Sequence, residues 1–228
     1  MSSRRFGGFA GIGFILTVLP VNIILGSTGM PQAGASRSEV LGYFAEHQGT
    51  IGLVTSLAVL AWMFLAMYAA GAVAAIRQHE RASGDSWSLV GLSGAVMQNA
   101  IFASVVATQA TLGLATISDD VAWGMWNLHN ALFTLNAASL VIVLVSISIG
   151  GRRAGLLAGW QHKVGLTAAA LLAVAALTTP VTIDGHPVAL VGLVGFLLWL
   201  VWIGSVSVAL LRPSDERQGV DADPVAAV

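Results

Sequence analysis

The stretch Trp87–Ser148, WSLVGLSGAVMQNAIFASVVATQATLGLATISDDVAWGMWNLHNALFTLNAASLVIVLVSIS, contains two long apolar segments joined by the acidic turn SDDV at residues 118–121. A helix needs about 20 predominantly apolar residues to cross the hydrocarbon core of a bilayer. Both segments are long enough, and the turn between them is short. The stretch therefore predicts an antiparallel pair of transmembrane helices.

The rest of the chain has the same character. Of its 228 residues 56% are hydrophobic and 9% are charged, whereas a soluble domain carries about 25% charged residues. Uncharged apolar runs recur along it, and we expect an all-α polytopic membrane protein with a six-helix transmembrane domain over residues 1–211. The predicted spans are 6–26, 50–76, 88–115, 125–149, 159–181 and 187–211. The polar tail 212–228 is predicted to be disordered.

The longest predicted loop, residues 27–48, contains its own helix signal. Ser36 and Glu39 have the spacing of a capping box, in which each side chain satisfies the other residue's free backbone amide. Val40, Phe44 and His47 then follow at helical spacing. The pattern predicts a short amphipathic helix on the membrane surface, or alternatively an extension of the second span.

The basic residues predict the orientation. Nine of the ten fall on one side of the predicted spans, and only Arg37 falls on the other. The positive-inside rule places that basic side, with both chain termini, in the cytoplasm. We therefore expect a multi-pass membrane protein with both termini on the cytoplasmic side. The nine residues are Arg4, Arg5, Arg77, Arg81, Arg152, Arg153, Lys163, Arg212 and Arg217.

Polar side chains inside the Trp87–Ser148 stretch are the candidate functional residues, because polar groups at membrane depth usually face a protein interior or a water-filled cavity. Counted along antiparallel helices, Gln109 falls level with Asn130. Gln98 and Asn99 fall near the midplane, whereas Gln109 and His129 fall nearer the outer surface. The predicted ligand-binding residues are Gln98, Asn99, Gln109, Trp126, Asn127, His129 and Asn130.

Three functions fit this pattern. Neutral hydrogen-bonding groups suit the binding or transport of a small uncharged or amphipathic molecule, including a lipophilic one, at an outward-facing site between spans three and four. A membrane-embedded enzyme could use His129 as a general acid or base, provided that a carboxylate orients it. An accessory subunit of a membrane complex would use the same amides only to hold helices together.

Other partners are constrained by composition. The chain has no cysteine and a net charge of −1, so thiolate metal sites and disulfides are excluded and nucleic acid is not expected. Glu46–His47 and Asp184–His186 could bind a divalent metal but equally resemble solvent-facing loops; we expect neither a metal nor another cofactor. Small residues four apart, such as Gly7 and Gly11, favour close helix packing within the chain or, alternatively, a homo-oligomer.

The residues Pro31, Ser38–Glu39–Val40–Leu41, Phe44 and His47, placed just before a span of an Ala/Gly/Val-rich chain, resemble those of actinobacterial six-span integral membrane proteins of unassigned function. The resemblance implies a bacterial plasma-membrane location. It implies no catalytic residues.

Overall fold

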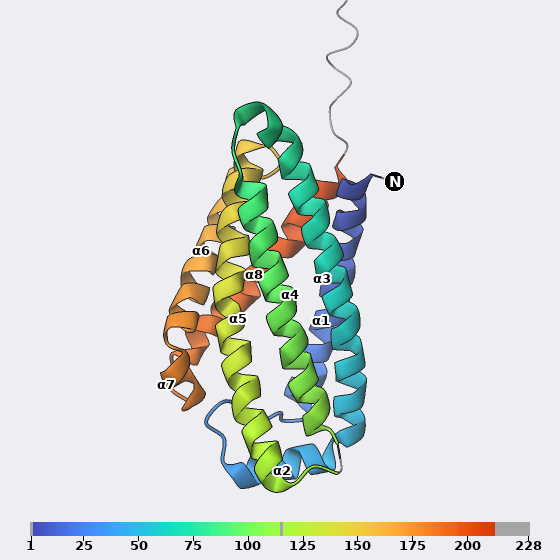
Figure 1. Cartoon of the computed structure of the whole chain (residues 1–228), viewed down its shortest axis with the longest axis vertical. Helices are drawn as coiled ribbons and strands as arrows, with labels where there is room; N and C mark the ends of the chain where they lie inside the picture. The colour runs from blue at the N-terminus through green and yellow to red at the C-terminus, as the bar shows by residue number, and fades with distance from the viewer. Residues whose placement is uncertain (1, 115, 213–228) are drawn as a thin grey trace, which may run out of the picture.

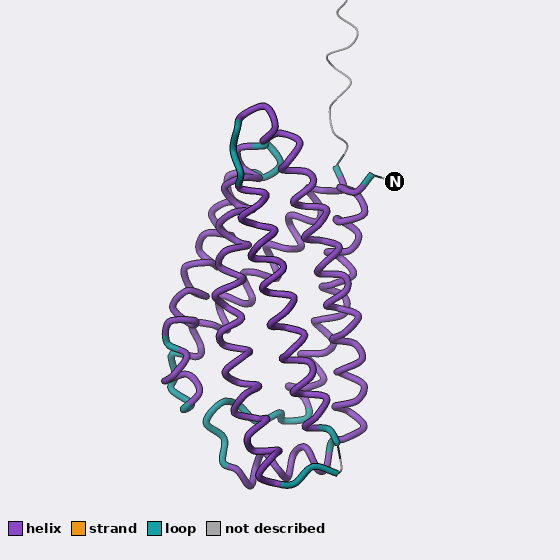
Figure 2. Tube along the Cα trace, viewed as in Figure 1, coloured by secondary structure: helices purple, strands orange, loops and turns teal. Residues whose placement is uncertain are grey.

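The computed structural model describes residues 2–114 and 116–212, and residues 213–228 of the predicted tail 212–228 lie outside this range. The described residues are all-helical (Figures 1 and 2). The helices are α1 (Ser3–Ser27), α2 (Arg37–Glu46), α3 (Gln48–Ser83), α4 (Trp87–Leu112), α5 (Asp119–Arg153), α6 (Gly159–Leu177), α7 (Thr179–Ile183) and α8 (Ala189–Leu211).

Six of these helices are long and apolar enough to cross a membrane, namely α1, α3, α4, α5, α6 and α8. They pack side by side in a closed ring in the order α1, α3, α4, α5, α6 and α8, and α8 returns to α1. The Arg4 side chain of α1 bonds the Ala209 carbonyl of α8, so the described chain begins and ends at the same end of the bundle. We call this the terminal end and the opposite one the α2 end (Figure 1).

Two apolar clusters fill the bundle. The larger includes Phe14, Tyr68, Leu144 and Trp202, from α1, α3, α5 and α8, and all four are buried. Glycines allow the helices around it to approach closely, as membrane helices require because lipid supplies little hydrophobic drive for their association. A Cβ built on Gly71 of α3 would lie 2.5 Å from the Gly7 Cα of α1. The Gly7 face is thus used within the chain.

The smaller cluster closes the α2 end. Helix α2 is separate from α3 and crosses the end of the bundle, where it buries Val40, Tyr43 and Phe44 (Figure 1). The Phe44 ring meets the Trp126 ring of α5 edge to face, with centroids 5.9 Å apart. One half of the predicted capping box is present, because the Ser36 hydroxyl accepts the Glu39 backbone N–H at 3.3 Å. The loop 27–48 therefore contains its own helix, which covers the bundle rather than lengthening the second span.

The helix ends differ from the predicted spans. Helices α3 and α5 have 36 and 35 residues, or about 53 to 54 Å at 1.5 Å per residue, well beyond a hydrocarbon core about 30 Å thick. The predicted span 159–181 is wrong at its far end, because α6 stops at Leu177 and α7 begins at Thr179. Pro180 explains the break, since proline lacks the amide that a continuing helix would use.

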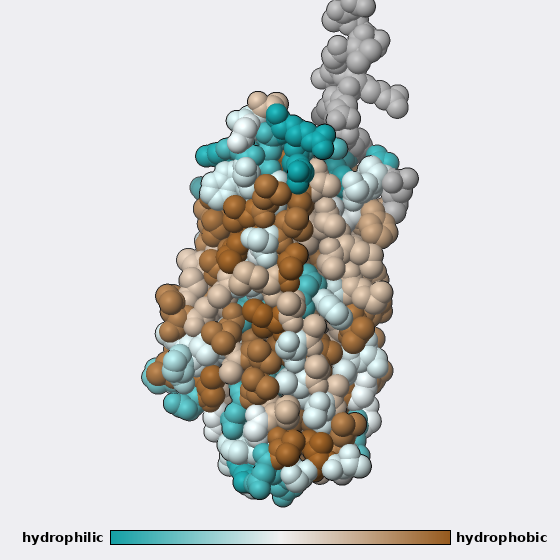
Figure 3. All heavy atoms as spheres, viewed as in Figure 1, coloured by the Kyte–Doolittle hydropathy of each residue, from teal (hydrophilic) through white to brown (hydrophobic). Residues whose placement is uncertain are grey.

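Charge and hydropathy are distributed as a membrane protein requires. Figure 3 shows apolar residues over the middle of the visible face and hydrophilic ones gathered at its two ends. Within the described residues the terminal end carries eight basic side chains and two acidic ones, Glu80 and Asp85. The α2 end carries one basic side chain, Arg37, and five acidic ones, Glu39, Glu46, Asp119, Asp120 and Asp184.

Glu80 is a buried carboxylate of α3 that contacts the first turn of α4. It lies near the end of α3, and its side chain accepts hydrogen bonds from the backbone N–H of Ser88, at 2.8 Å, and from the Ser88 hydroxyl. Ser88 is in the first turn of α4, whose backbone amides have no partner within the helix. Ser86, at the usual capping position, makes no side-chain cap. Glu80 therefore caps α4 from the preceding helix.

Glu80→Ala should destabilise the protein by about 1–3 kcal/mol, because it leaves buried donors at Ser88 without an acceptor. Asp85→Ala is the control, since it removes a neighbouring carboxylate whose ion pair with Arg153 lies at the surface, with side chains 29% and 53% exposed. Such pairs contribute about 0–1 kcal/mol. The stability of both variants is measured by thermal unfolding in detergent. Equal losses would show that the Glu80 cap contributes little.

Candidate functional site

The structure separates the seven predicted site residues. Trp126, His129 and Asn130 lie on α5 near the α2 end, and the first two are buried. Gln98 and Gln109 are buried on α4, and Asn99 is partly buried there. Asn127 is exposed on the surface of α5. The seven residues therefore do not form one polar vestibule.

His129 is the centre of a hydrogen-bonded group between α4 and α5. Its Nδ1 lies 3.1 Å from the Thr108 hydroxyl and 3.3 Å from the Val105 carbonyl. The imidazole is stacked between Trp126 and Phe133, with ring centroids 5.8 and 6.4 Å away. Because the Val105 carbonyl can only accept, Nδ1 carries the proton in the arrangement that satisfies both contacts. His129 thereby holds Thr108 in place.

A groove runs along the outside of the bundle in front of Thr108. It has a volume of about 440 Å³ and opens widely to the surface between α4 and α5. The α4 wall carries hydroxyl side chains, and the α5 wall is apolar. The lining residues are Ser104, Ala107, Thr108 and Thr111 of α4, and Met125, Leu128 and Leu132 of α5.

The three hydroxyls of the α4 wall form a row of hydrogen-bond acceptors. Each one donates its proton to a carbonyl of its own helix: Ser104 to Ala100 at 3.1 Å, Thr108 to Val105 at 2.8 Å, and Thr111 to Ala107 at 3.0 Å. A hydroxyl oxygen that has donated its proton still has two lone pairs. The wall can thus accept hydrogen bonds from a ligand, at Thr108 through the lone pair that His129 does not use, but its hydroxyls have no free proton to donate. A neutral apolar molecule with a hydroxyl group fits such a wall.

Gln109 lies in a different seam, between α3 and α4. Gly113 of α4 packs on Ile51 of α3, so Gln109 and Thr55, each one turn further into the bundle, lie level with each other. Within the described residues, the Gln109 Nε2 and the Thr55 Oγ1 are buried without a hydrogen-bond partner. Gln109 is therefore separated from the groove by the body of α4.

The remaining amides bond mainly to their own helices. The Asn99 amide donates to the Ala95 carbonyl at 2.8 Å, and the Asn130 amide donates to the Trp126 carbonyl at 3.0 Å. Gln109 and Asn130, which the sequence predicts to lie level, form no hydrogen bond with each other among the described residues. The pair that meets across these helices is Thr108 with His129, one residue earlier on each.

Sequence reasoning missed the hydroxyl row. Its signal was present, since Ser104, Thr108 and Thr111 have the spacing of one helical face. The predicted polar site residues, apart from Trp126, are amides and a histidine, which are the more costly groups in hydrocarbon. The hydroxyls of Ser and Thr have a low free-energy cost in hydrocarbon when they donate to a carbonyl of the preceding turn. Their number on a span therefore gives little indication of function.

The histidines of the α2-end loops are separate from the groove. The His47 ring stacks on Tyr43 with centroids 4.4 Å apart, and the His186 Nδ1 accepts the Val188 backbone N–H at 3.3 Å. The loops before α2 and after α7 meet instead through Gly34 and Gly185, which both have positive φ. In the part of the chain that the structure describes, no three His or acidic side chains gather as a metal site would need.

Comparison of the chain with protein-family models, with curated proteins and with solved structures gave no match.

Proposed function

We propose that this membrane protein binds a neutral amphipathic molecule, with an alkyl or ring body and a hydroxyl group, in the groove between α4 and α5. One observation carries the proposal: the groove joins a row of three hydroxyl acceptors to an apolar wall of Met125, Leu128 and Leu132. The ligand hydroxyl would donate to the row, and its apolar body would cover the α5 wall. Since none of the described residues that line the groove is charged, a charged ligand is disfavoured.

The proposal includes an orientation. The basic excess at the terminal end supports a cytoplasmic position for both chain termini by the positive-inside rule. The groove lies in the half of the bundle nearer the α2 end, and it would then face the outer leaflet of a bacterial plasma membrane. A lipophilic ligand would enter sideways from the lipid.

The two alternative functions receive less support. An acid–base role for His129 needs a carboxylate within hydrogen-bond reach, and within the described residues its hydrogen-bond partners are Thr108 and Val105. A role as an accessory subunit is favoured by no particular surface. We therefore keep the binding function alone.

Photolabelling tests the proposal. The protein, reconstituted in lipid nanodiscs, is irradiated with a long-chain alcohol that carries a diazirine in its alkyl chain, and the labelled peptides are mapped by mass spectrometry. The expected labels fall on α5 at Met125–Leu132 and on the facing part of α4. Labels distributed evenly over the exposed apolar residues of all six long helices would reject the groove as a site.

The hydroxyl row should set the preference for alcohols. In Ser104→Ala combined with Thr111→Val, the groove keeps its approximate shape but loses two acceptors. At about 1 kcal/mol for a typical hydrogen bond, the preference for the alcohol over its methyl ether, which has no proton to donate, should fall several-fold. The measurement is competition by each compound against the labelled probe. An unchanged preference would mean that the row does not contact the ligand hydroxyl.

A further inference from the structure

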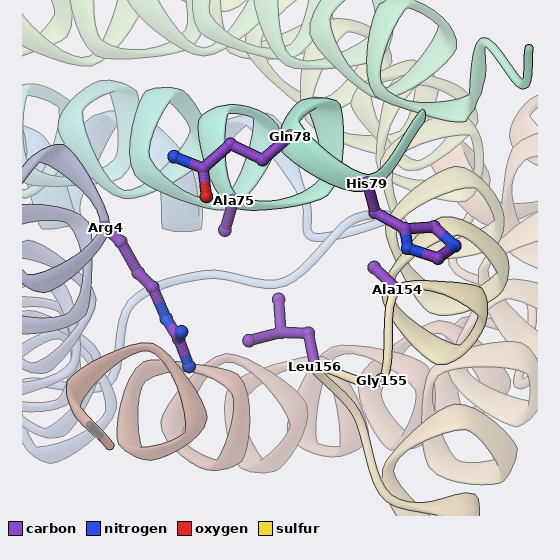
Figure 4. Close-up of a pocket in the computed structure, with 7 residues that line it drawn as sticks. All are labelled: Arg4, Ala75, Gln78, His79, Ala154, Gly155 and Leu156. Atoms are coloured by element: carbon purple, nitrogen blue, oxygen red, sulfur yellow. The ribbon is translucent and has the colours of Figure 1, made fainter. Parts of the chain in front are cut away.

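A second pocket lies at the terminal end, far along the bundle from the groove. It has a volume of about 190 Å³ and is half enclosed between the start of α1, the last turns of α3 and the turn from α5 to α6 (Figure 4). This space holds about six water molecules at their share of liquid volume, about 30 Å³ each. Arg4, Gln78 and His79 supply its polar groups, and Ala75 and Leu156 supply an apolar part.

Arg4 is fixed in this pocket with donors unused. Its Nη2 donates to the Ala209 carbonyl at 3.0 Å, in the last turn of α8, where a cation also interacts favourably with the helix dipole. A guanidinium has five N–H donors. Within the described residues the Arg4 Nε is buried and has no hydrogen-bond partner. In Figure 4 the side chain runs from α1 along one side of the cavity, and His79 lies on the other.

Nothing anionic among the described residues balances Arg4. The two carboxylates of the terminal end are engaged elsewhere: Glu80 caps α4 through Ser88, and Asp85 forms an ion pair with Arg153. Among the described residues, none that lines the pocket is acidic. A fixed arginine with free donors, in a pocket that an amide and an imidazole also line, is suited to an oxyanion with several acceptor oxygens, and phosphate is the common one.

The position of the pocket indicates the source of the phosphate. The apolar part of α3 ends at Ile76 and is followed by Arg77, Gln78 and His79, so the pocket lies where the bundle leaves the hydrocarbon. Trp160, 55% exposed at the start of α6, is also typical of this interface. Basic pockets between helices at this depth can accept lipid head groups.

We propose that the pocket formed by Arg4, Gln78 and His79 binds the phosphate group of an anionic phospholipid. The Arg4 guanidinium contacts the phosphate oxygens, Gln78 and His79 add further N–H donors, and Ala75 and Leu156 contact the start of the acyl chains. This site is independent of the alcohol site in the groove.

The test is the thermal stability of the full chain in detergent with added phosphatidylglycerol, phosphatidylcholine or inorganic phosphate at equal ionic strength. Phosphatidylglycerol should stabilise the wild type most, and Arg4→Gln should weaken its apparent affinity roughly 10- to 100-fold, as expected for a lost charge-assisted hydrogen bond. Arg5→Gln is the matched control, since Arg5 is the exposed neighbour on the same helix. This variant should bind phosphatidylglycerol with the affinity of the wild type.

Arg4→Gln also removes the bond to Ala209, so a second variant is needed. Gln78→Leu keeps that bond and should still weaken the binding of phosphatidylglycerol. Equal losses in Arg4→Gln and Arg5→Gln would overturn the proposal, because they would show a diffuse surface charge rather than a site. Stabilisation by inorganic phosphate that depends on Arg4 and matches that by phosphatidylglycerol would overturn the lipid as the source and leave a site for free phosphate.

Discussion

Gly71→Leu is expected to destabilise the bundle by about 3 kcal/mol, the upper end of the range for overpacked cores. At Gly71 the backbones of α1 and α3 touch, and a Cβ there would lie 2.5 Å from the Gly7 Cα and 2.9 Å from the Ser3 carbonyl oxygen. Backbone atoms cannot rotate away as a side chain can. The first helix would therefore have to move off the third, opening the ring that α1 closes with α8.

Gly52→Leu is the matched control. Gly52 lies on the same helix, and nothing lies within 4 Å of its Cβ position. Leucine is favoured over glycine in a helix by about 0.8 kcal/mol, so this variant should be as stable as the wild type or slightly more so. The measurement is the unfolding free energy in mixed micelles with increasing denaturing detergent. Similar stabilities for the two variants would show that α1 does not pack on α3 as described.

Leu128→Trp is expected to remove most of the photolabelling by the long-chain alcohol. Leu128 lies on the α5 wall of the groove and is 46% exposed. The larger indole would fill space that the ligand needs, and it would do so without entering the protein interior. The fold should be unaffected, so the thermal stability of the variant should remain that of the wild type.

Leu135→Trp separates filling of the groove from the general effect of a new tryptophan on a lipid-facing helix. Leu135 is on the same helix and is 47% exposed, but it does not line the groove. Its labelling should match that of the wild type. If Leu128→Trp were labelled as strongly as Leu135→Trp, the alcohol would be binding elsewhere, and the proposed function would fail whatever the outcome at Arg4.

Hydropathy and length were sufficient to predict the six long helices, because an apolar run of about 20 residues has few alternatives in a membrane. The ends of the helices were harder to predict. Arg77–Ser83 is polar enough to suggest a loop, yet α3 continues through it to Gly84, whose φ of 75° ends the helix. Pro180 is a readable stop signal inside the predicted span 159–181.

The candidate site was predicted only by its region. Sequence reasoning chose α4 and α5 and singled out His129, which is indeed buried between them. It grouped Gln109 with His129 because both lie near the outer end of their spans. The structure instead places Gln109 toward α3. Thr108 and Gln109 are adjacent on α4, and adjacent residues on a helix point about 100° apart, so only one of the two can face α5.

The membrane class, the number of long helices and the side on which the basic residues collect could all be predicted from the amino-acid sequence, since each follows from the composition of a segment taken alone. The tertiary structure decided which polar groups meet. The bond from Thr108 to His129 and the groove beside it join the consecutive helices α4 and α5, and the pocket of Arg4 with His79 joins α1, α3 and the turn from α5 to α6. Their contacts depend on helix rotation and on the order around the ring, which no single segment encodes.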